Sequence, residues 1–184
     1  DFSKKHNLKI GTIADLINYR IFNEQTVKRL ESKSVKTEHG RFNLILYKDL
    51  IFEETHIVLQ KGRISKNTST LVRVQQSNLY HDLLNIDEFG TRWSISDAMK
   101  KINKAGNGII LLIDGDNNKE NGFKEIRASK KKRKTVPNND PRRIGIGSQI
   151  LRDLGVKKIK LMGSEVRYPS LSGFDLEVTE YIKK

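Results

Sequence analysis

Two arginines and an aspartate near residue 140 form the clearest chemical motif of the chain. Asp140, Arg142 and Arg143 stand just ahead of Gly145-Ile146-Gly147 and an apolar helix pattern over residues 148–154. Because backbone N–H groups at a helix N-terminus attract anions, this stretch is a candidate phosphate site. A tight turn beside a solvated basic edge accounts for the same residues equally well, and both interpretations stay open.

A second group of candidate side chains lies in a polar loop. His81, Asp82, Asp87 and Glu88 could be a hard-metal or imidazole-metal cluster. Such groups are common in exposed loops, and nothing in their spacing fixes their mutual geometry. We therefore expect this loop to hold no metal.

The remaining histidines and the only tryptophan offer weaker signals. His56 lies in a run of alternating character, where we expect a solvated strand histidine. His39 precedes a glycine turn, and the sequence names no partner for it. Trp93 stands at the start of a helix pattern, and we expect it to anchor the core rather than stack on a base.

The polar loop lies inside a strand–loop–helix–strand unit. A β-branched strand at residues 71–74 precedes the loop, and an apolar strand at residues 109–113 ends the unit. Between them, a helix that stops at Gly106 is predicted from five apolar residues at helical spacing: Ile95, Ala98, Met99, Ile102 and Ala105. A loop longer than packing needs usually carries a site.

Other elements extend the α/β pattern on both sides of this unit. Strands are predicted at residues 42–47, 55–60 and 158–162, with a last strand ending at Tyr181. A second helix buries a face formed by Ile150, Leu151 and Leu154 and ends at Gly155. Near the N-terminus, Thr12 is suited to cap a further helix.

Composition limits the class of protein. The 184 residues are 36% apolar with a mean hydropathy of −0.58, and they contain no cysteine. No stretch approaches the roughly 18 consecutive apolar residues of a membrane span. The absence of cysteine excludes disulfides and thiolate chemistry and fits a cytoplasmic protein. The N-terminus is polar and charged and carries no signal peptide pattern.

The positive charge is concentrated in one part of the chain. The net charge is +13, and residues 124–160 hold 13 Lys or Arg against 3 acidic residues. Residues 130–134, from Lys130 to Lys134, are a purely basic run that predicts a protruding, solvated loop. A polyanion or an acidic partner is the alternative, although no aromatic residues accompany the run for base stacking.

The order of motifs resembles GTP cyclohydrolase II, which opens the guanine ring of GTP in riboflavin synthesis. The family pattern runs R-V-H-S-E-C, then D, then C-D-C-G, a helix and G-R-G-(I/V)-L. This chain has R-V-Q-Q-S-N from Arg73, then Asp82, then F-G-T-R from Phe89, the helix and G-N-G-I from Gly106. This resemblance implies an α/β fold with a mixed sheet flanked by helices. It also places the family's three zinc-binding cysteines on Asn78, Phe89 and Thr91, side chains that cannot replace thiolates.

Other family positions are partly kept. Residues 140–156 match D-x-R-x-(Y/F)-x-x-(G/A)-x-Q-(I/M)-L-x-x-L-G-V, the most specific motif of the chain. By this resemblance Arg142 corresponds to the arginine thought to attack the α-phosphate, and Asp140 to its acidic neighbour. Arg73, Arg142 and Arg143 are therefore the expected phosphate-binding residues.

Several family contacts with the nucleotide are lost. The catalytic tyrosine of I-R-A-Y has become Ser129, and Asp114 replaces an arginine. After the strand at residues 158–162, the family's T-N-N-P-x-K is replaced by G-S-E-V-R. Without its metal and tyrosine, the domain lacks a visible way to activate water for attack on the guanine ring.

The N-terminal residues resemble another enzyme of the same pathway. H-N-L-K-I-G-T-I-A-D-L-I-N-Y-R is similar to the closing segment of dihydroxybutanone phosphate synthase. This resemblance implies two parts: residues 1–33 as the tail of a synthase domain and residues 34–184 as a GTP cyclohydrolase II-like domain. Mg²⁺ or Mn²⁺ would belong to the missing synthase domain, and no cofactor is expected in this one.

These observations favour a catalytically degenerate cyclohydrolase-like domain that serves a dihydroxybutanone phosphate synthase as an assembly or regulatory module. We expect a cytoplasmic homodimer. One alternative is a metal-independent enzyme that uses Arg142 and Asp140 on a phosphorylated substrate. The other is a module that binds nucleic acid or an acidic protein through residues 124–134.

Overall fold

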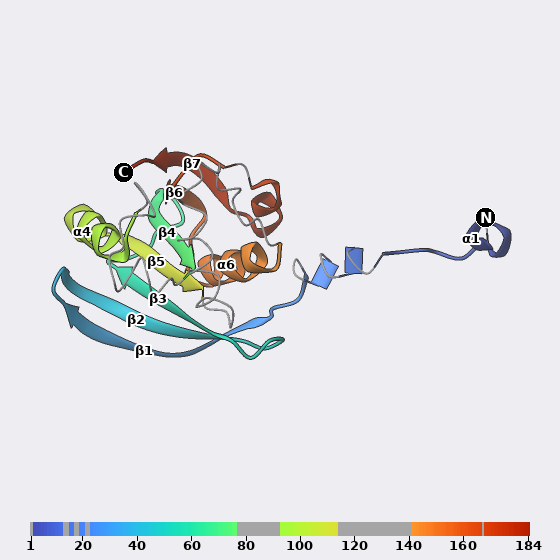
Figure 1. Cartoon of the computed structure of the whole chain (residues 1–184), viewed down its shortest axis with the longest axis horizontal. Helices are drawn as coiled ribbons and strands as arrows, with labels where there is room; N and C mark the ends of the chain where they lie inside the picture. Colours follow the sequence, from blue (N-terminus) through green and yellow to red (C-terminus); the bar gives the residue numbers. More distant parts are fainter. Residues whose placement is uncertain are drawn as a thin grey trace, which may run out of the picture.

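The computed structural model describes residues 2–12, 15–16, 19–20, 23–76, 93–113, 141–166 and 168–184. Its centre is a single sheet of seven strands in the order β1-β2-β3-β5-β4-β6-β7, shown in Figure 1. The strands are β1 (Val27–Thr37), β2 (Gly40–Asp49), β3 (Thr55–Lys61), β4 (Thr70–Gln76), β5 (Gly108–Ile113), β6 (Lys158–Met162) and β7 (Glu177–Ile182).

The sheet combines two kinds of pairing. Strands β1, β2 and β3 form an antiparallel meander, and β3 also pairs antiparallel with β5. Strands β5, β4, β6 and β7 run parallel. This mixed sheet, with helices packed on it, confirms the α/β fold expected from the sequence.

Two helices cover opposite faces of the sheet. Helix α4 (Ile95–Ala105) packs Ala98 and Ile102 into a small core with Phe42 and Ile110. Helix α6 (Pro141–Asp153) contributes to a larger core. The members of that larger core include Ile45, Val58, Val72, Ile109, Leu111, Ile146, Ile150 and Leu151. Since neighbouring residues of β5 alternate between the two cores, each core occupies its own face of the sheet.

Helix α4 follows the sequence prediction closely. The Ser94 side chain accepts a hydrogen bond from the Asp97 backbone N–H and so caps the N-terminus. Gly106 adopts a left-handed conformation (φ 79°), and its N–H bonds to the carbonyl groups of Ile102 and Asn103. Trp93 is only 8% exposed within the core on this face, as expected.

Helix α6 differs from the prediction at its start. It begins at Pro141, so Arg142 and Arg143 lie in its first turn, and Gly145 and Gly147 lie inside the helix rather than in a turn before it. Gly147 has a packing role: a Cβ added there would lie 3.3 Å from Cδ1 of Ile113 on the sheet. The predicted end is confirmed, since Gly155 follows the helix with φ 82°.

Strand β1 crosses the boundary predicted between residues 33 and 34. It begins at Val27 and pairs with β2 along its length, from Val27 with Asp49 to Thr37 with Gly40. Most of its residues are exposed, which explains why no alternating pattern announced it. The division of the chain into two domains stays a prediction.

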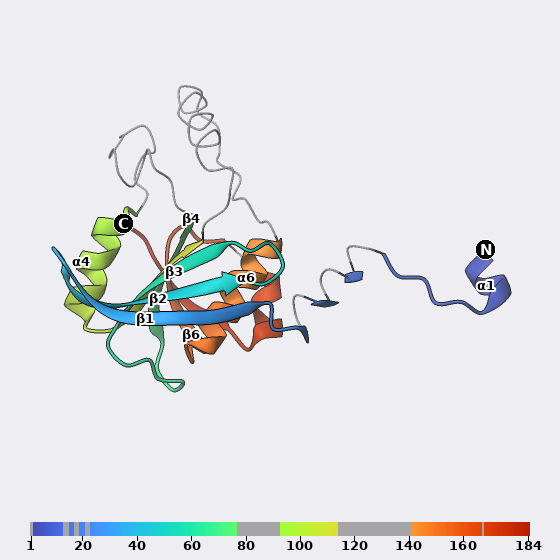
Figure 2. The same ribbon diagram turned by 90° about the horizontal axis from the view of Figure 1, so that it is seen from below.

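The segment ahead of Gln25 runs away from the sheet in both Figure 1 and Figure 2. It carries helix α1 (Phe2–His6), and Thr12 Oγ1 accepts a hydrogen bond from the Asp15 N–H at 3.0 Å, which supports the predicted cap. Large apolar side chains here are 54–78% exposed: Phe2, Leu8, Ile10, Leu16 and Tyr19. Among the described residues, no helix is long and apolar enough to cross a membrane.

Candidate functional site

The candidate site lies at the edge where the parallel strands end. Strand β4 connects to β5 through α4 on one face, and β5 connects to β6 on the other side of β4 with α6 on the opposite face. In open α/β sheets, such a change of direction leaves a crevice outside the carboxyl ends of the strands, where ligands bind. Strands β4 and β5 end at this edge, and the residues that follow them in sequence, 77–92 and 114–140, lie outside the described residues.

Arg142 lies at this edge on the α6 face, held by the loop that joins β2 and β3. Its Nη2 donates to Oε2 of Glu54 at 2.5 Å, with the two side chains 29% and 20% exposed. Its guanidinium carbon lies 3.5 Å from the centre of the Phe52 ring. An ion pair that is partly shielded from water and stacked on a ring is stronger than an exposed one. Arg142 is thus fixed in place before any ligand arrives.

Arg73 lies on β4 and points to the other face. Its Nη1 donates to the Met162 carbonyl at 2.8 Å, and its Nη2 donates to the Trp93 carbonyl at 3.3 Å. Its Nε donates to Oε1 of Gln75 at 3.0 Å. These bonds connect the ends of β4 and β6 to the start of α4, so Arg73 stabilises the backbone around the site.

The predicted phosphate-binding arginines are therefore distributed over two faces. Arg142 and its half-buried neighbour Arg143 start the helix on the α6 face, whereas Arg73 bonds to backbone on the α4 face. The guanidinium groups therefore do not form a single anion-binding site in this structure. Phosphate binding by them stays a prediction.

Tyr168 is a polar side chain near Arg73 that the sequence analysis did not single out. Burial raises the pKa of its phenol, and the positive charge of Arg73 opposes that shift. The neighbouring Tyr181 donates from its hydroxyl to the Val166 carbonyl at 2.5 Å. No periodic pattern marks residues 163–168, which explains why the sequence gave no signal for this contact.

Two of the histidines differ from expectation. His56, expected to be solvated, is fully buried at 0% exposure, and that prediction is wrong. The signal was present, since His56 is two residues from the buried Val58 and therefore shares its face of β3. His39 has a clear partner: its Nε2 lies 2.7 Å from Oγ of Ser96 on α4.

Many of the family positions fall outside the described residues. These are the zinc positions Asn78, Phe89 and Thr91, the loop residues His81, Asp82, Asp87 and Glu88, and Asp114, Ser129, Lys130 to Lys134 and Asp140. The family's zinc ligands are three thiolates, and the chain contains no cysteine, so the residue types present do not fit that ligand set. Loss of the family's zinc site stays a prediction.

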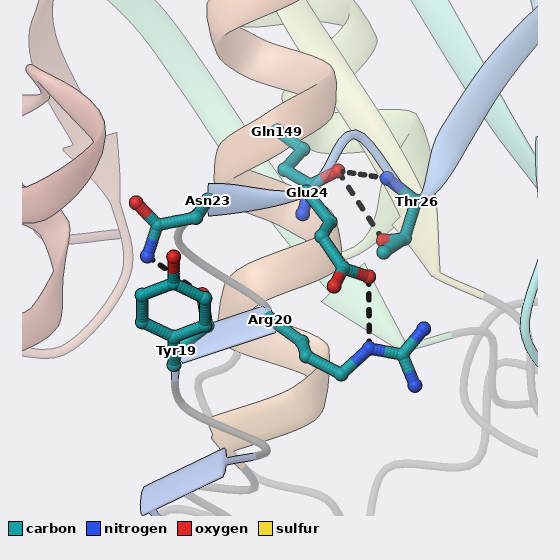
Figure 3. A network of polar contacts seen from close by, with 6 residues as sticks. All are labelled: Tyr19, Arg20, Asn23, Glu24, Thr26 and Gln149. Atoms are coloured by element: carbon teal, nitrogen blue, oxygen red, sulfur yellow. Dashed lines mark hydrogen bonds and ion pairs between the residues drawn. The ribbon is translucent and has the colours of Figure 1, made fainter.

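Helix α6 also contacts the point where the N-terminal segment joins the sheet. Figure 3 shows Oε1 of Gln149 accepting from the Thr26 backbone N–H at 2.8 Å and from its hydroxyl at 3.3 Å. A cavity of about 160 Å³ is lined there by Gln25, Gln149, Arg152 and Asp153. The same helix therefore joins the candidate site to the base of the N-terminal segment.

Comparison with known proteins agrees with this geometry. A model of the GTP cyclohydrolase II family matches residues 28–183. The chain is 40% identical to a 3,4-dihydroxy-2-butanone 4-phosphate synthase of Pseudomonas aeruginosa over 187 residues, which cover 98% of this chain and 50% of that protein. It is 37% identical to the riboflavin biosynthesis protein RibBA of Aquifex aeolicus over 194 residues, or 99% of this chain and 48% of that protein.

A solved structure is similar over the whole chain. This is RibBX from A. baumannii, described as a two-domain 3,4-dihydroxy-2-butanone 4-phosphate synthase, with a TM-score of 0.62 and 37% identity. The match covers 100% of this chain and 48% of that one, so the chain spans about half the length of the relatives it matches. With a family pattern that runs from residue 28 to residue 183, the chain belongs to the GTP cyclohydrolase II family.

Proposed function

We propose that this chain is the cyclohydrolase-like half of a riboflavin biosynthesis protein whose activity is dihydroxybutanone phosphate synthesis. In this proposal the half described here does not open GTP, and it serves the synthase half as an assembly or regulatory module. Two relatives support the proposal by their names: the P. aeruginosa protein and RibBX are both called dihydroxybutanone phosphate synthases although each contains a region similar to this chain.

The observation that carries the proposal is the loss of the thiolates. All 184 residues lack cysteine, and the positions that correspond to the family's zinc ligands are Asn78, Phe89 and Thr91. An amide, a phenyl ring and a neutral hydroxyl do not bind zinc as thiolates do. In this proposal the chain lacks the metal ion that, in the family's reaction, would activate water near neutral pH.

The state of Arg142 argues in the same direction. A guanidinium that is to attack or bind a phosphate must present its donors to that ligand, whereas Arg142 Nη2 is bonded to Glu54 and the group is stacked on Phe52. A metal-independent enzyme using Arg142 and Asp140 would first have to break this ion pair. The alternative of nucleic-acid binding depends on residues 124–134, which lie outside the described residues.

An assembly role is supported by what the chain exposes. The N-terminal segment carries exposed apolar side chains, and Leu50, Ile51 and Phe52 in the β2–β3 loop are 45–55% exposed. The backbone N–H of Leu50 bonds to the Thr26 carbonyl at 2.8 Å, so this loop lies beside the base of the N-terminal segment. The apolar stripes of α4 and α6 pack inward and are not available for an interface.

The oligomeric state of the purified chain tests the assembly role. We expect a homodimer at micromolar concentration, with roughly 1,200–2,000 Å² of total buried surface, the range of specific interfaces. Sedimentation velocity measures it directly. A monomer of 21.2 kDa would remove the assembly role and leave regulation of the synthase half as the remaining form of the proposal.

A further inference from the structure

Three side chains of the kinds that bind metal ions meet where the β2–β3 hairpin closes. Asp49 ends β2, Glu54 directly precedes β3, and His56 is its second residue. Each offers a ligand atom, and these atoms all lie within 4.8 Å of one another. The hairpin register explains the grouping, since Tyr47 pairs with His56 and the Asp49 N–H bonds to the Glu54 carbonyl at 2.8 Å.

The burial of this group is unusual for charged residues. Asp49 is 1% exposed and His56 0%, whereas the Glu54 side chain retains 20% exposure. Buried carboxylates are almost never found without partners, because removal from water strongly disfavours the charged form. Asp49 and His56 are thus shielded from solvent, and Glu54 is the member of the group that solvent reaches.

Asp49 supplies a separate observation that points to a ligand. Its Oδ1 accepts hydrogen bonds from the N–H groups of Ile51 at 2.8 Å and Phe52 at 3.3 Å. Its Oδ2 is buried, and within the described part of the chain it has no hydrogen-bond partner. A buried carboxylate oxygen without a partner costs stability and calls for an unseen ion.

We propose that Asp49, Glu54 and His56 bind a divalent transition-metal ion. Two carboxylates and one imidazole suit Zn²⁺ or Mn²⁺, whereas Mg²⁺ and Ca²⁺ prefer ligand sets made entirely of oxygen. Among the first-row ions, Zn²⁺ binds such ligands more tightly than Mn²⁺. The site is distinct from the family's cysteine site, which is the site that the expectation of no zinc concerned.

Arg142 competes with the metal for Glu54. Two carboxylates and one guanidinium leave the group with a net negative charge, and Arg142 neutralises Glu54 directly through the 2.5 Å bond. A cation that binds Glu54 repels the guanidinium at short range. Metal binding therefore releases Arg142 from Glu54, at the edge of the sheet where the parallel strands end.

Calorimetric titration of the tag-free, chelator-stripped chain with Zn²⁺ tests the site. We expect one Zn²⁺ per chain and clearly weaker binding of Mg²⁺. Glu54→Gln and His56→Gln should each weaken Zn²⁺ binding by at least about tenfold, since each removes a ligand. Arg142→Gln should tighten binding by about threefold, because it removes the competing charge.

Matched controls separate the site from surface binding. Glu180→Gln alters a carboxylate that is paired with Lys160 at an exposed position, and His39→Gln alters a histidine elsewhere in the fold. Both should bind Zn²⁺ as the unchanged chain does. Because Glu54 is partly exposed, Glu54→Gln should keep its fold even if His56→Gln does not, as circular dichroism can verify.

Absence of Zn²⁺ binding by the unchanged chain, or equal binding by Glu54→Gln, would overturn the site. Weaker binding by Arg142→Gln would overturn the competition. The titration needs no synthase half and no substrate, so its failure would leave the proposed function untouched.

Discussion

The two faces of the sheet hold different kinds of side chains. On the α4 face the core is apolar apart from Gln75, which accepts a hydrogen bond from Arg73, and Ala98 and Ile102 pack beneath a helix with regular caps at both ends. On the α6 face a larger apolar core is bordered by buried polar groups, among them Asp49, His56 and Gln149. The α4 face is mainly a packed apolar core, whereas the α6 face also buries polar side chains whose burial costs stability.

Most of the buried polar side chains in the described part of the chain lie on the α6 face. Buried polar side chains destabilise a fold unless each one is bonded, so a structural face tends to exclude them. The α6 face keeps them at both of its borders: beside Arg142 at the strand ends, and beside Thr26 at the base of the N-terminal segment. A domain selected for stability alone would be expected to bury fewer polar side chains.

Replacing one core isoleucine on each face gives the largest expected effects. Ile150 on α6 and Ile102 on α4 are both 0% exposed. Each change to alanine should cost about 2–5 kcal/mol of unfolding free energy, measured by urea denaturation. Ile150→Ala should also tighten Zn²⁺ binding, because α6 holds the competing guanidinium of Arg142 against Glu54, whereas Ile102→Ala should leave binding unchanged. Equal effects on binding would contradict a functional difference between the faces.

Breaking the Arg142–Glu54 pair comes next. Arg142→Gln leaves a carboxylate that is 20% exposed without its guanidinium, and we expect a loss of about 1–3 kcal/mol. Arg20→Gln is the matched control, since the Arg20–Glu24 pair is 50% and 45% exposed and should contribute at most about 0.5 kcal/mol. If the two variants lose the same unfolding free energy in urea, the Arg142–Glu54 pair stabilises the fold no more than an exposed ion pair does.

The cap of α4 should contribute a smaller amount. Ser94→Ala removes the acceptor for the Asp97 N–H, and we expect a loss of about 1 kcal/mol without any change in Zn²⁺ binding. Ser164→Ala, at an exposed serine, serves as the control and should be neutral in thermal unfolding. A change in metal binding on loss of the cap would show that the two faces are coupled.

The smallest expected effect appears at alkaline pH on the α6 face. The Tyr47 hydroxyl donates to Oδ2 of Asp153 at 2.5 Å, and burial, followed by this bond, raises the pKa of the phenol well above its ordinary value. A raised pKa in the folded state gives stability that is complete below the unfolded pKa of about 10 and is lost as pH rises through the folded pKa.

Tyr47→Phe should therefore lose about 1 kcal/mol at pH 8 and show a shallower decline in stability above pH 10 than the unchanged chain. Urea denaturation at the two pH values measures both quantities. If stability falls equally steeply with pH in both proteins, ionisation of Tyr47 does not contribute to unfolding at alkaline pH.

Helix α4 could be predicted from sequence almost to the residue, whereas the start of helix α6 could not. Helix α4 combines a serine cap, apolar residues at helical spacing and a glycine stop, all of them local signals. Helix α6 starts with Pro141 and contains Gly145 and Gly147, which are typical of turns. The close approach of Gly147 to Ile113, which is distant in sequence, favours a small residue there and gives no local signal.

The site shows the same limit. His56 could have been assigned to the interior from its phase with Val58, but its grouping with Asp49 depends on the hairpin register. The Arg142–Glu54 pair joins residues 88 positions apart, and no local pattern indicates it. Strand β1 was missed in part because an exposed edge strand carries little alternation.

The central claim is that this domain keeps the cyclohydrolase frame without the cyclohydrolase reaction. Formate release from GTP by the purified protein, measured with Zn²⁺ added in excess, tests this claim most directly. We expect no release above a control without protein, whether or not the hairpin site binds the metal, because the family's thiolate ligands are absent from the chain. Sustained turnover that scales with protein concentration would contradict the account.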